Sequence, residues 1–180
     1  MTDFRETAVD APDAQTLLTE YFTGREKTFP SAQGTYQTKL PDPAAFTADR
    51  GLFLVVADGA ELLGCGGIRR IDDGPLGARW EIKHLYVREA ARGRRLGRGI
   101  LEELERRAAA LGAAELVLDT NDSLEAAGGL YRSSGYVTVE PYNDNPNATT
   151  WYAKPVAATH WLPEPDRPPS TASGSAAQYG

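Results

Sequence analysis

The stretch VREAARGRRLGRGIL, residues 87–101, decides how this chain can fold. Residues 80–87 alternate in hydrophobicity and predict a β-strand. The residues after the loop carry apolar side chains at helical spacing and predict a helix that ends before Gly112. Between strand and helix lies a loop that combines arginines with glycines: Arg88, Arg92, Arg94, Arg95 and Arg98, with Gly93, Gly97 and Gly99.

This loop has the composition of an anion-binding site. The first N–H groups of a helix lack intrahelical partners, and the helix dipole adds partial positive charge at that end. Glycines allow the backbone to approach a ligand closely, and arginines add charged, fork-shaped donors. The loop therefore predicts a bound phosphate or pyrophosphate. The alternative interpretation is a solvated run of charge.

The segments after the loop predict one further strand–helix unit and two closing strands. Residues 116–120 predict a short strand, and residues 123–134 predict a helix that Ser123 caps and Gly135 ends. Residues 136–139 and 149–154 predict two final strands, joined by PYNDNPNA. After residue 156 the composition shifts to Pro, Ser, Ala and Gly. This shift predicts one folded domain over residues 1–156 and a disordered tail over residues 157–180.

The segments before the loop predict a hairpin and an N-terminal helix. Asp58-Gly59 separates two apolar runs, residues 52–57 and 62–71, which predicts a β-hairpin. Residues 14–22 have helical periodicity, with Asp10 as the expected N-cap. The pattern fails from Thr23, so residues 23–37 are expected to form a loop with at most one helical turn. Residues 43–50 predict a short second helix.

Composition and charge exclude several classes of protein. The net charge of −6 over 180 residues argues against a nucleic-acid partner. No apolar run of about 18 residues and no basic-then-apolar leader occur, so we expect no membrane association and a cytoplasmic location. The single cysteine, Cys65, excludes an intramolecular disulfide, and two histidines without a CxxC motif argue against a metal site. We expect a monomer or a homodimer.

Three segments together resemble the GNAT superfamily of acyl-CoA-dependent N-acetyltransferases. They are EIKHLYV (81–87), ARGRRLGRGIL (91–101) and LDTNDSLEAAGGLYRSSGY (118–136), and the resemblance extends over about residues 51–154. YNDNPNATTWYAK (142–154) also resembles the closing hairpin of a bacterial subgroup of unknown specificity. The resemblance implies an α/β (α+β) GNAT fold, with a mixed, mostly antiparallel sheet of six to seven strands and about four helices. It also implies acetyl-CoA as cosubstrate.

The superfamily's pyrophosphate motif, Arg/Gln-x-x-Gly-x-Gly/Ala, fits the loop in two registers. Residues 94–99 match letter for letter, whereas residues 92–97 place Arg95 where a glycine is usual. The motif normally begins five residues after the strand's last valine, which favours the register that starts at Arg92. In this register the resemblance implies that the loop backbone holds the pyrophosphate and the end of the strand pairs with pantetheine. The implied contacts come from Leu85, Tyr86, Val87, Arg92, Gly93, Arg94, Arg95, Leu96, Gly97 and Arg98.

The resemblance also implies catalytic roles. Tyr131 matches the tyrosine of the family's Ala-x-x-Leu-Tyr pattern, which protonates the departing CoA thiolate in many members and contacts the cofactor there. Packing on a helix face is the alternative for this tyrosine. Glu81 lies where histone acetyltransferases keep their general base, and Asp119 lies where another branch keeps a glutamate in that role. Glu81 is the favoured base, and a plain ion pair with Lys83 is its alternative.

A second position, after Arg95, departs from the family pattern. The asparagine that is common seven residues before the tyrosine is absent, because Leu124 stands there, and Asn121 is the nearest substitute for a cofactor contact. His84 is expected to be structural, and Cys65 is expected to be a small buried hydrophobe.

The expected reaction is acetyl transfer to a small-molecule or peptide amine. An alkylammonium group has a pKa near 10.4, so a carboxylate, acting directly or through water, must take its proton before attack on the thioester. A water chain, or an amine that binds already neutral, is the alternative to a carboxylate base. Two other classes stay open: a catalytically silent GNAT fold that senses acyl-CoA, and a Rossmann-type nucleotide-binding domain with Asp119 as its ribose-binding acid. The absence of GxGxxG counts against the second class. Residues 23–47 and 141–149 are expected to line the acceptor site, whose ligand the sequence does not identify.

Overall fold

The Asp58-Gly59 turn forms the predicted hairpin. It joins β2 (Gly51–Asp58) to β3 (Glu61–Arg70), and Gly59 adopts a φ of +59° in the turn. β4 (Arg79–Val87) continues the antiparallel meander, which confirms three consecutive strands. The computed structural model describes residues 1–157. Residues 158–180, which hold nearly all of the predicted disordered tail, lie outside the described residues.

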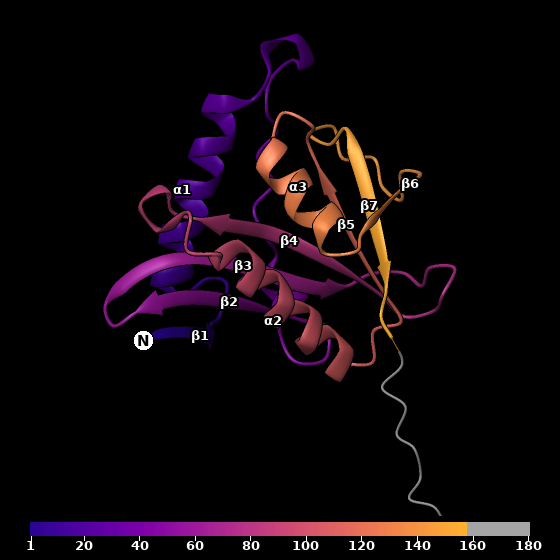
Figure 1. Ribbon diagram of the computed structural model, residues 1–180, viewed down its shortest axis with the longest axis horizontal. Coiled ribbons are helices and arrows are strands. Elements are labelled where there is room, and N and C mark those ends of the chain that lie inside the picture. Colours follow the sequence, from indigo (N-terminus) through magenta and orange to yellow (C-terminus); the bar gives the residue numbers. More distant parts are fainter. Residues whose placement is uncertain (158–180) are drawn as a thin grey trace, which may run out of the picture.

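The strands form one sheet in the order β1-β2-β3-β4-β5-β7-β6 (Figure 1). β5 (Glu115–Thr120), β6 (Val137–Val139) and β7 (Thr150–Pro155) agree with the predicted strands. β1 (Thr2–Glu6) was not predicted from the sequence, because it is a short, polar edge strand in which only Phe4 is strongly apolar. All neighbours pair antiparallel except β4 and β5, so the sheet is mixed and mostly antiparallel as expected.

β4 and β5 separate soon after they begin to pair. Only Arg79–Glu81 and Glu115–Val117 are in register, and beyond them the two strands diverge (Figure 1). The later residues of β4 therefore present an unpaired backbone edge toward the opening. Neighbouring strands normally satisfy each other's N–H and C=O groups, so this wedge leaves hydrogen-bonding capacity for another molecule.

Helices cover both faces of the sheet. α1 (Pro12–Thr28) packs through Leu17 and Phe22 on one face, beside Phe53 of β2. α2 (Leu96–Ala110) and α3 (Glu125–Ser133) share the core of the other face. Gly66 of β3 makes this second packing possible. A Cβ there would lie 2.9 Å from Ile100 and 3.0 Å from Leu104, so the missing side chain lets α2 approach the sheet.

α1 departs most from the prediction. It begins after Ala11 rather than Asp10, and it continues through residues 23–28, where the sequence predicts a loop. The apolar stripe ends at Phe22, but the next buried position of the helix is Arg25, a charged residue that no hydrophobic pattern reveals. The guanidinium of Arg25 lies over the Tyr36 ring, 5.4 Å from its centroid, and this contact ties the last turn of the helix to the following loop.

Two smaller expectations are also wrong. The second helix, expected over residues 43–50, is a short 3₁₀ turn, Pro43–Phe46, and a further 3₁₀ turn spans Ser31–Gln33. Residues 1–157 therefore contain three α-helices rather than about four. Ser123 does not cap α3, whose N-cap is Leu124; the Ser123 amide instead donates to the Asn121 side chain. No helix among these residues combines the length and hydropathy needed to cross a membrane.

Candidate active site

The arginine- and glycine-rich loop enters α2 through a left-handed residue. Arg95 is the N-cap, with φ 59° and ψ 18°, and no side chain caps the helix. In the part of the chain that the structure describes, the backbone amides of residues 93–98 have no hydrogen-bond acceptor. They lie at the positive end of the α2 dipole, which is the arrangement of an anion-binding helix N-terminus. The left-handed turn occurs at the position where the register beginning at Arg92 expects glycine.

The arginines of this loop have different partners. Arg88 forms an ion pair with Glu20 of α1, with 2.6 Å between Nη2 and Oε1, so its charge is already balanced. Arg98 donates to two serine hydroxyls at the end of α3. The side chains of Arg92 and Arg95 form no hydrogen bond or ion pair with residues 1–157, and both residues line an open cleft. These two guanidinium groups are available for an anionic ligand.

The cleft has a volume of about 990 Å³ and lies between the end of β4, the loop, α2 and α3. Its size suits a large cofactor. Most of the predicted cofactor-binding residues line it: Leu85, Tyr86, Val87, Arg92, Gly93, Arg95, Leu96, Gly97 and Arg98. The side chain of Arg94 is not part of its lining and lies 3.9 Å from Asp58. The arrangement brings the anion-binding loop and the unpaired edge of β4 into one groove.

Two further cavities continue from the cleft toward the opposite face of the sheet. A narrow junction of about 90 Å³ lies at the wedge between β4 and β5, and it shares Tyr21, Arg25 and Leu85 with the cleft. A third cavity of about 650 Å³ opens beside α1 and the loop before β7, and it shares Tyr21, Lys83 and Asp119 with the junction. The common lining residues place the three cavities in sequence across the sheet.

Tyr131 lies at the junction. Its side chain is buried, and its ring packs against Tyr136 and Tyr152 at centroid distances of 6.0 and 5.9 Å. Its hydroxyl forms no hydrogen bond within residues 1–157. Burial, together with the negative charge of Asp119, raises the pKa of Tyr131 well above its ordinary value. The hydroxyl is therefore protonated at neutral pH and free to donate.

Glu81 lies behind the cavities rather than in them. Its carboxylate is 1% exposed and forms an ion pair with Arg69 at 2.5 Å. It also accepts a hydrogen bond of 3.0 Å from the Tyr142 hydroxyl and lies 3.4 Å from the ammonium group of Lys83. Glu81 is not part of the lining of the three cavities. A proton from a substrate could therefore reach the Glu81 carboxylate only through a neighbouring group.

Asp119 lines both the junction and the third cavity. It lies 3.2 Å from the Lys83 ammonium and accepts hydrogen bonds from Asn143 (2.7 Å) and Asn145 (3.1 Å). Burial by itself would raise the pKa of Asp119, but Lys83 and the two amide donors outweigh it and lower the pKa below its ordinary value. Asp119 is thus ionised at neutral pH, with its charge balanced by Lys83.

Asn121 joins three segments at the mouth of the junction. Its amide group donates to the Gln33 side chain at 2.6 Å and to the Asn147 carbonyl at 3.0 Å, and its oxygen accepts from the Ser123 amide. Both amide hydrogens are therefore engaged inside the protein. Asn121 closes the loop before β7 onto the end of β5, a role that its sequence position did not reveal.

A bulge in β4 brings His84 to the wedge. Gly67 pairs with Lys83 but Cys65 pairs with Tyr86, so β4 contains one residue more than β3 across this step. His84 adopts a φ of +55° there. Its ring packs against aromatic side chains of α1, and burial, aided by Lys83 and Arg69, lowers the pKa of His84 to about 3. The imidazole is neutral at physiological pH and lines the junction.

Sequence reasoning missed the polar network around the wedge. Arg69 and Lys83 balance the two acidic side chains, and Tyr142, Asn143 and Asn145 bind them. The loop PYNDNPNA contains these three residues, and its density of amide side chains was the one available signal. Their partners could not be predicted, because each pair joins residues that are distant in the chain.

Known proteins resemble this chain in sequence and in structure. The sequence model of the acetyltransferase (GNAT) family matches residues 12–136. An uncharacterized N-acetyltransferase of Schizosaccharomyces pombe is 33% identical over 151 residues, which are 81% of this chain and 87% of that protein. The IAA acetyltransferase of Azospirillum brasilense is 34% identical over 90 residues, 50% of this chain and 57% of that protein. The structure of an acetyltransferase of the GNAT family from Staphylococcus aureus superposes on this chain with a TM-score of 0.68 and 15% sequence identity. The superposition covers 87% of this chain and 99% of that chain. At this identity the likeness shows the fold alone.

Proposed function

The chain belongs to the GNAT acetyltransferase family, and from this premise we propose that it transfers the acetyl group of acetyl-CoA to a primary amine by direct attack. Acetyl-CoA-dependent acetyl transfer is the general kind of reaction in this family, and the chain is an acyltransferase. The Rossmann alternative is wrong, because the sheet is mostly antiparallel rather than doubly wound and parallel. We propose the cytoplasm as its compartment and a small-molecule or peptide amine as its acceptor.

One observation carries the cofactor's placement. Backbone amides at the start of α2 and the side chains of Arg92 and Arg95, all without a partner among residues 1–157, lie along one cleft of about 990 Å³. In this proposal the pyrophosphate binds there, and pantetheine runs along the unpaired edge of β4 like an added strand. The thioester would then reach the junction beside Tyr131, and the amine would enter from the third cavity.

The proposed reaction needs no covalent intermediate on the protein. The amine nitrogen bonds to the thioester carbonyl carbon, and the carbon–sulfur bond then breaks as the tetrahedral intermediate collapses. Tyr131 gives its proton to the departing thiolate, which releases CoA as a neutral thiol and leaves the tyrosine to regain a proton from solvent. The acceptor is an ammonium group at neutral pH, so it first loses one proton to a carboxylate, directly or through a water molecule, and the neutral amine then attacks. Attack makes the nitrogen much more acidic, so its second proton passes to water.

The geometry favours Asp119 over Glu81 as the direct proton acceptor. Asp119 lines the junction and the third cavity, whereas Glu81 is 1% exposed and bonded to Arg69 and Tyr142. Glu81 remains the second candidate, although neither it nor Tyr142 is part of the lining of the three described cavities. The earlier preference for Glu81 came from the family resemblance, which carries no information about its ion pairs here.

Turnover with a panel of amines tests the function. The protein should release CoA from acetyl-CoA with at least one class among polyamines, amino acids, aminoglycosides and peptide N-termini. CoA binding without turnover would make the protein an acyl-CoA sensor instead. For the base, Asp119→Asn should lower the rate mainly near neutral pH, with a deficit that shrinks at high pH, where the amine deprotonates unaided.

The control for the base is Asp144→Asn, which removes an exposed carboxylate from the lining of the third cavity. It should leave the pH profile unchanged. A deficit in Asp119→Asn that stays constant with pH would indicate a positioning role for that carboxylate. A larger and pH-dependent deficit in Glu81→Gln would return the role of base to Glu81.

A further inference from the structure

Arg25 is a buried cation without a counterion in the described chain. It lies in the last turns of α1, its side chain is 7% exposed, and its Nη1 atom is buried without a hydrogen-bond partner. No ion pair joins it to another group of residues 1–157, and its contact with the Tyr36 ring satisfies none of its N–H donors. A buried guanidinium group is costly unless it is paired, so this position calls for an anionic partner.

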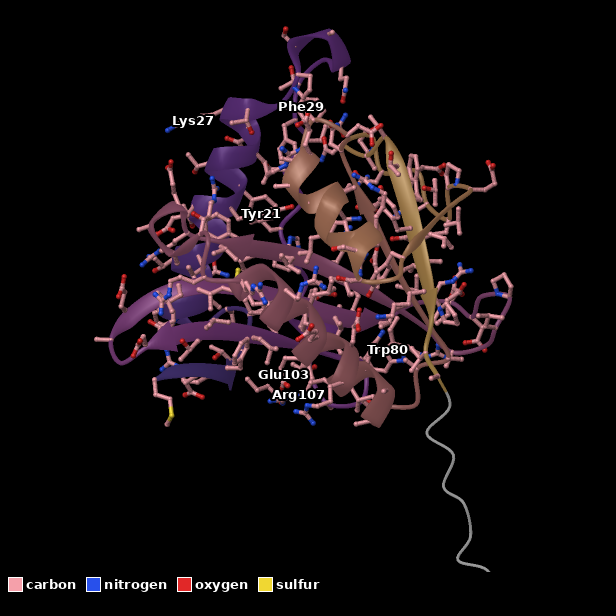
Figure 2. The ribbon with its side chains drawn as sticks, viewed as in Figure 1. Tyr21, Lys27, Phe29, Trp80, Glu103 and Arg107 are labelled. Atoms are coloured by element: carbon pink, nitrogen blue, oxygen red, sulfur yellow. The ribbon has the colours of Figure 1, made fainter. Side chains whose placement is uncertain are left out.

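The location of Arg25 identifies where that partner binds. Arg25 lines the cofactor cleft and the junction, where Tyr131 and Asp119 also lie. Tyr21, one helical turn earlier, lies on the same side of α1 and lines the same two cavities. Figure 2 shows Tyr21 on the side of α1 that faces α3, whereas Lys27 points away from the domain. Arg25 is thus oriented toward the reacting end of the cleft.

The other cations near the junction already have partners. Arg69 and Lys83 are paired with Glu81 and Asp119, and Arg88 is paired with Glu20 of α1. The pyrophosphate of CoA would meet Arg92 and Arg95, which belong to the loop and do not line the junction. Arg25 therefore differs from the other cations of the described junction. No acidic group among residues 1–157 balances its charge, and the pyrophosphate would bind elsewhere.

We propose that Arg25 binds a carboxylate carried by one of the two substrates. A guanidinium group presents parallel N–H donors that match the two oxygens of a carboxylate. The carboxylate can belong to the amine acceptor, as in an amino acid, or to a dicarboxylic acyl group on CoA. This inference rests on the proposed function and adds a substrate class to the same site. No additional chemical step is involved, because the carboxylate only orients the reacting molecule.

Paired substrates separate the two sources. One arm compares an α-amino acid with its amide as the acceptor for acetyl-CoA, and the other compares succinyl-CoA with butyryl-CoA as the donor for one fixed amine. In one of the two arms, kcat/KM should favour the carboxylate member by about 10–100-fold, as a charge-assisted hydrogen-bonded pair predicts. Arg25→Gln should remove this preference, and Arg25→Lys, which keeps the charge without the fork, should retain part of it.

The matched control is Lys27→Gln, which removes the same charge from an exposed position of the same helix. Lys27→Gln should leave the preference for the carboxylate-bearing substrate unchanged. An unchanged preference would show that the effect of Arg25→Gln does not come from the lower net charge alone. The proposal is overturned if neither arm shows a preference, or if the preference survives in Arg25→Gln. Circular dichroism and chemical unfolding establish whether each variant is folded, and Arg25→Lys carries the test if Arg25→Gln does not fold.

A binding experiment distinguishes failure of this inference from failure of the proposed function. Succinate and an N-acetyl amino acid are titrated calorimetrically into the CoA-saturated wild-type protein and into the Arg25 variants. Binding of either probe that falls at least tenfold in Arg25→Gln supports the proposal even where turnover is absent. An equally large fall in CoA affinity would assign Arg25 to the cofactor and overturn it. A wild-type protein that binds no CoA would contradict the proposed function itself.

Discussion

At Arg95 an arginine occupies a backbone conformation that glycine adopts at little cost. Its φ is +59°, and a left-handed conformation costs a residue with a Cβ roughly 1–2 kcal/mol. Arg95→Gly should therefore raise the free energy of unfolding by about 1 kcal/mol, measured by denaturant titration. Arg94→Gly, the neighbouring control without a positive φ, should lower it. A less stable Arg95→Gly would mean that the arginine side chain compensates for the strain.

Tyr131 and Tyr152 provide a contrast between two buried tyrosines. The Tyr131 hydroxyl has no partner within residues 1–157, whereas that of Tyr152 accepts a hydrogen bond of 3.1 Å from Arg132. Tyr131→Phe should lower kcat by about 10²–10⁴-fold with little change in stability, because a general acid is lost but no hydrogen bond. Tyr152→Phe should do the reverse, with kcat preserved and a stability loss of about 1 kcal/mol. If Tyr131→Phe keeps more than about a third of the wild-type kcat while the chemical step limits the rate, Tyr131 is a packing residue and not the general acid.

Among the elements, α2 is attached to the edge strand β1 by charge. Glu103 is bonded to Arg106 and Arg107 at 2.6 and 2.7 Å, and Arg107 reaches Glu6 of β1 at 2.8 Å. Figure 2 places Glu103 and Arg107 beside each other on α2. The hydrogen bond from Arg106 outweighs burial and, with Arg107, lowers the pKa of Glu103 from 4.5 to about 2.

This lowered pKa makes the stability that Glu103 contributes within α2 depend on pH. A carboxyl group with a depressed folded-state pKa stabilises the fold above its unfolded value, and that stabilisation is lost as the pH falls from about 4.5 toward 2. Glu103→Gln should therefore lower the free energy of unfolding near pH 7 by on the order of 1 kcal/mol. The difference between variant and wild type should narrow below about pH 4, measured by urea titration at several pH values. A difference that is constant with pH would contradict the ion-pair account.

The wedge between β4 and β5 is an element-scale feature that lies beside a network of buried charges. Pairing ends at Glu81, and the network of Glu81, Arg69, Lys83 and Asp119 lies where the strands part. Each charge of this network has an opposite neighbour. The network therefore places both candidate bases beside the opening.

For the molecule as a whole, cofactor binding should couple to stability. Saturating CoA or acetyl-CoA should raise Tm by several degrees, because a ligand present at about 100 times its Kd adds roughly 2.7 kcal/mol. Arg92→Gln should weaken CoA binding, measured by calorimetry, because the guanidinium group of Arg92 lines the cleft and has no partner in the described part of the chain. Arg94→Gln is the matched control, since that side chain lies outside the cleft lining. Equal losses in both variants would indicate a diffuse effect of charge rather than a defined pyrophosphate site.

The sequence by itself determined the elements and the family. Alternation and turn residues are local signals, so the hairpin at Asp58-Gly59, the strand before the loop and the helix up to Ala110 were predicted and confirmed. The same reasoning failed where an element has no apolar pattern, as in β1, or where a buried residue is charged, as at Arg25 in α1.

Only the tertiary structure decided which charges are free. Arg88 and Arg92 belong to one loop and look alike in the sequence, yet Arg88 is paired with Glu20 of α1 and Arg92 lines the cleft. Glu81 was the favoured base from the family resemblance, and only the partners of the two carboxylates show that Glu81 is buried in ion pairs whereas Asp119 lines the junction. Such pairs join residues from distant parts of the chain, and the energy of an ion pair depends on distance and burial rather than on position in the sequence.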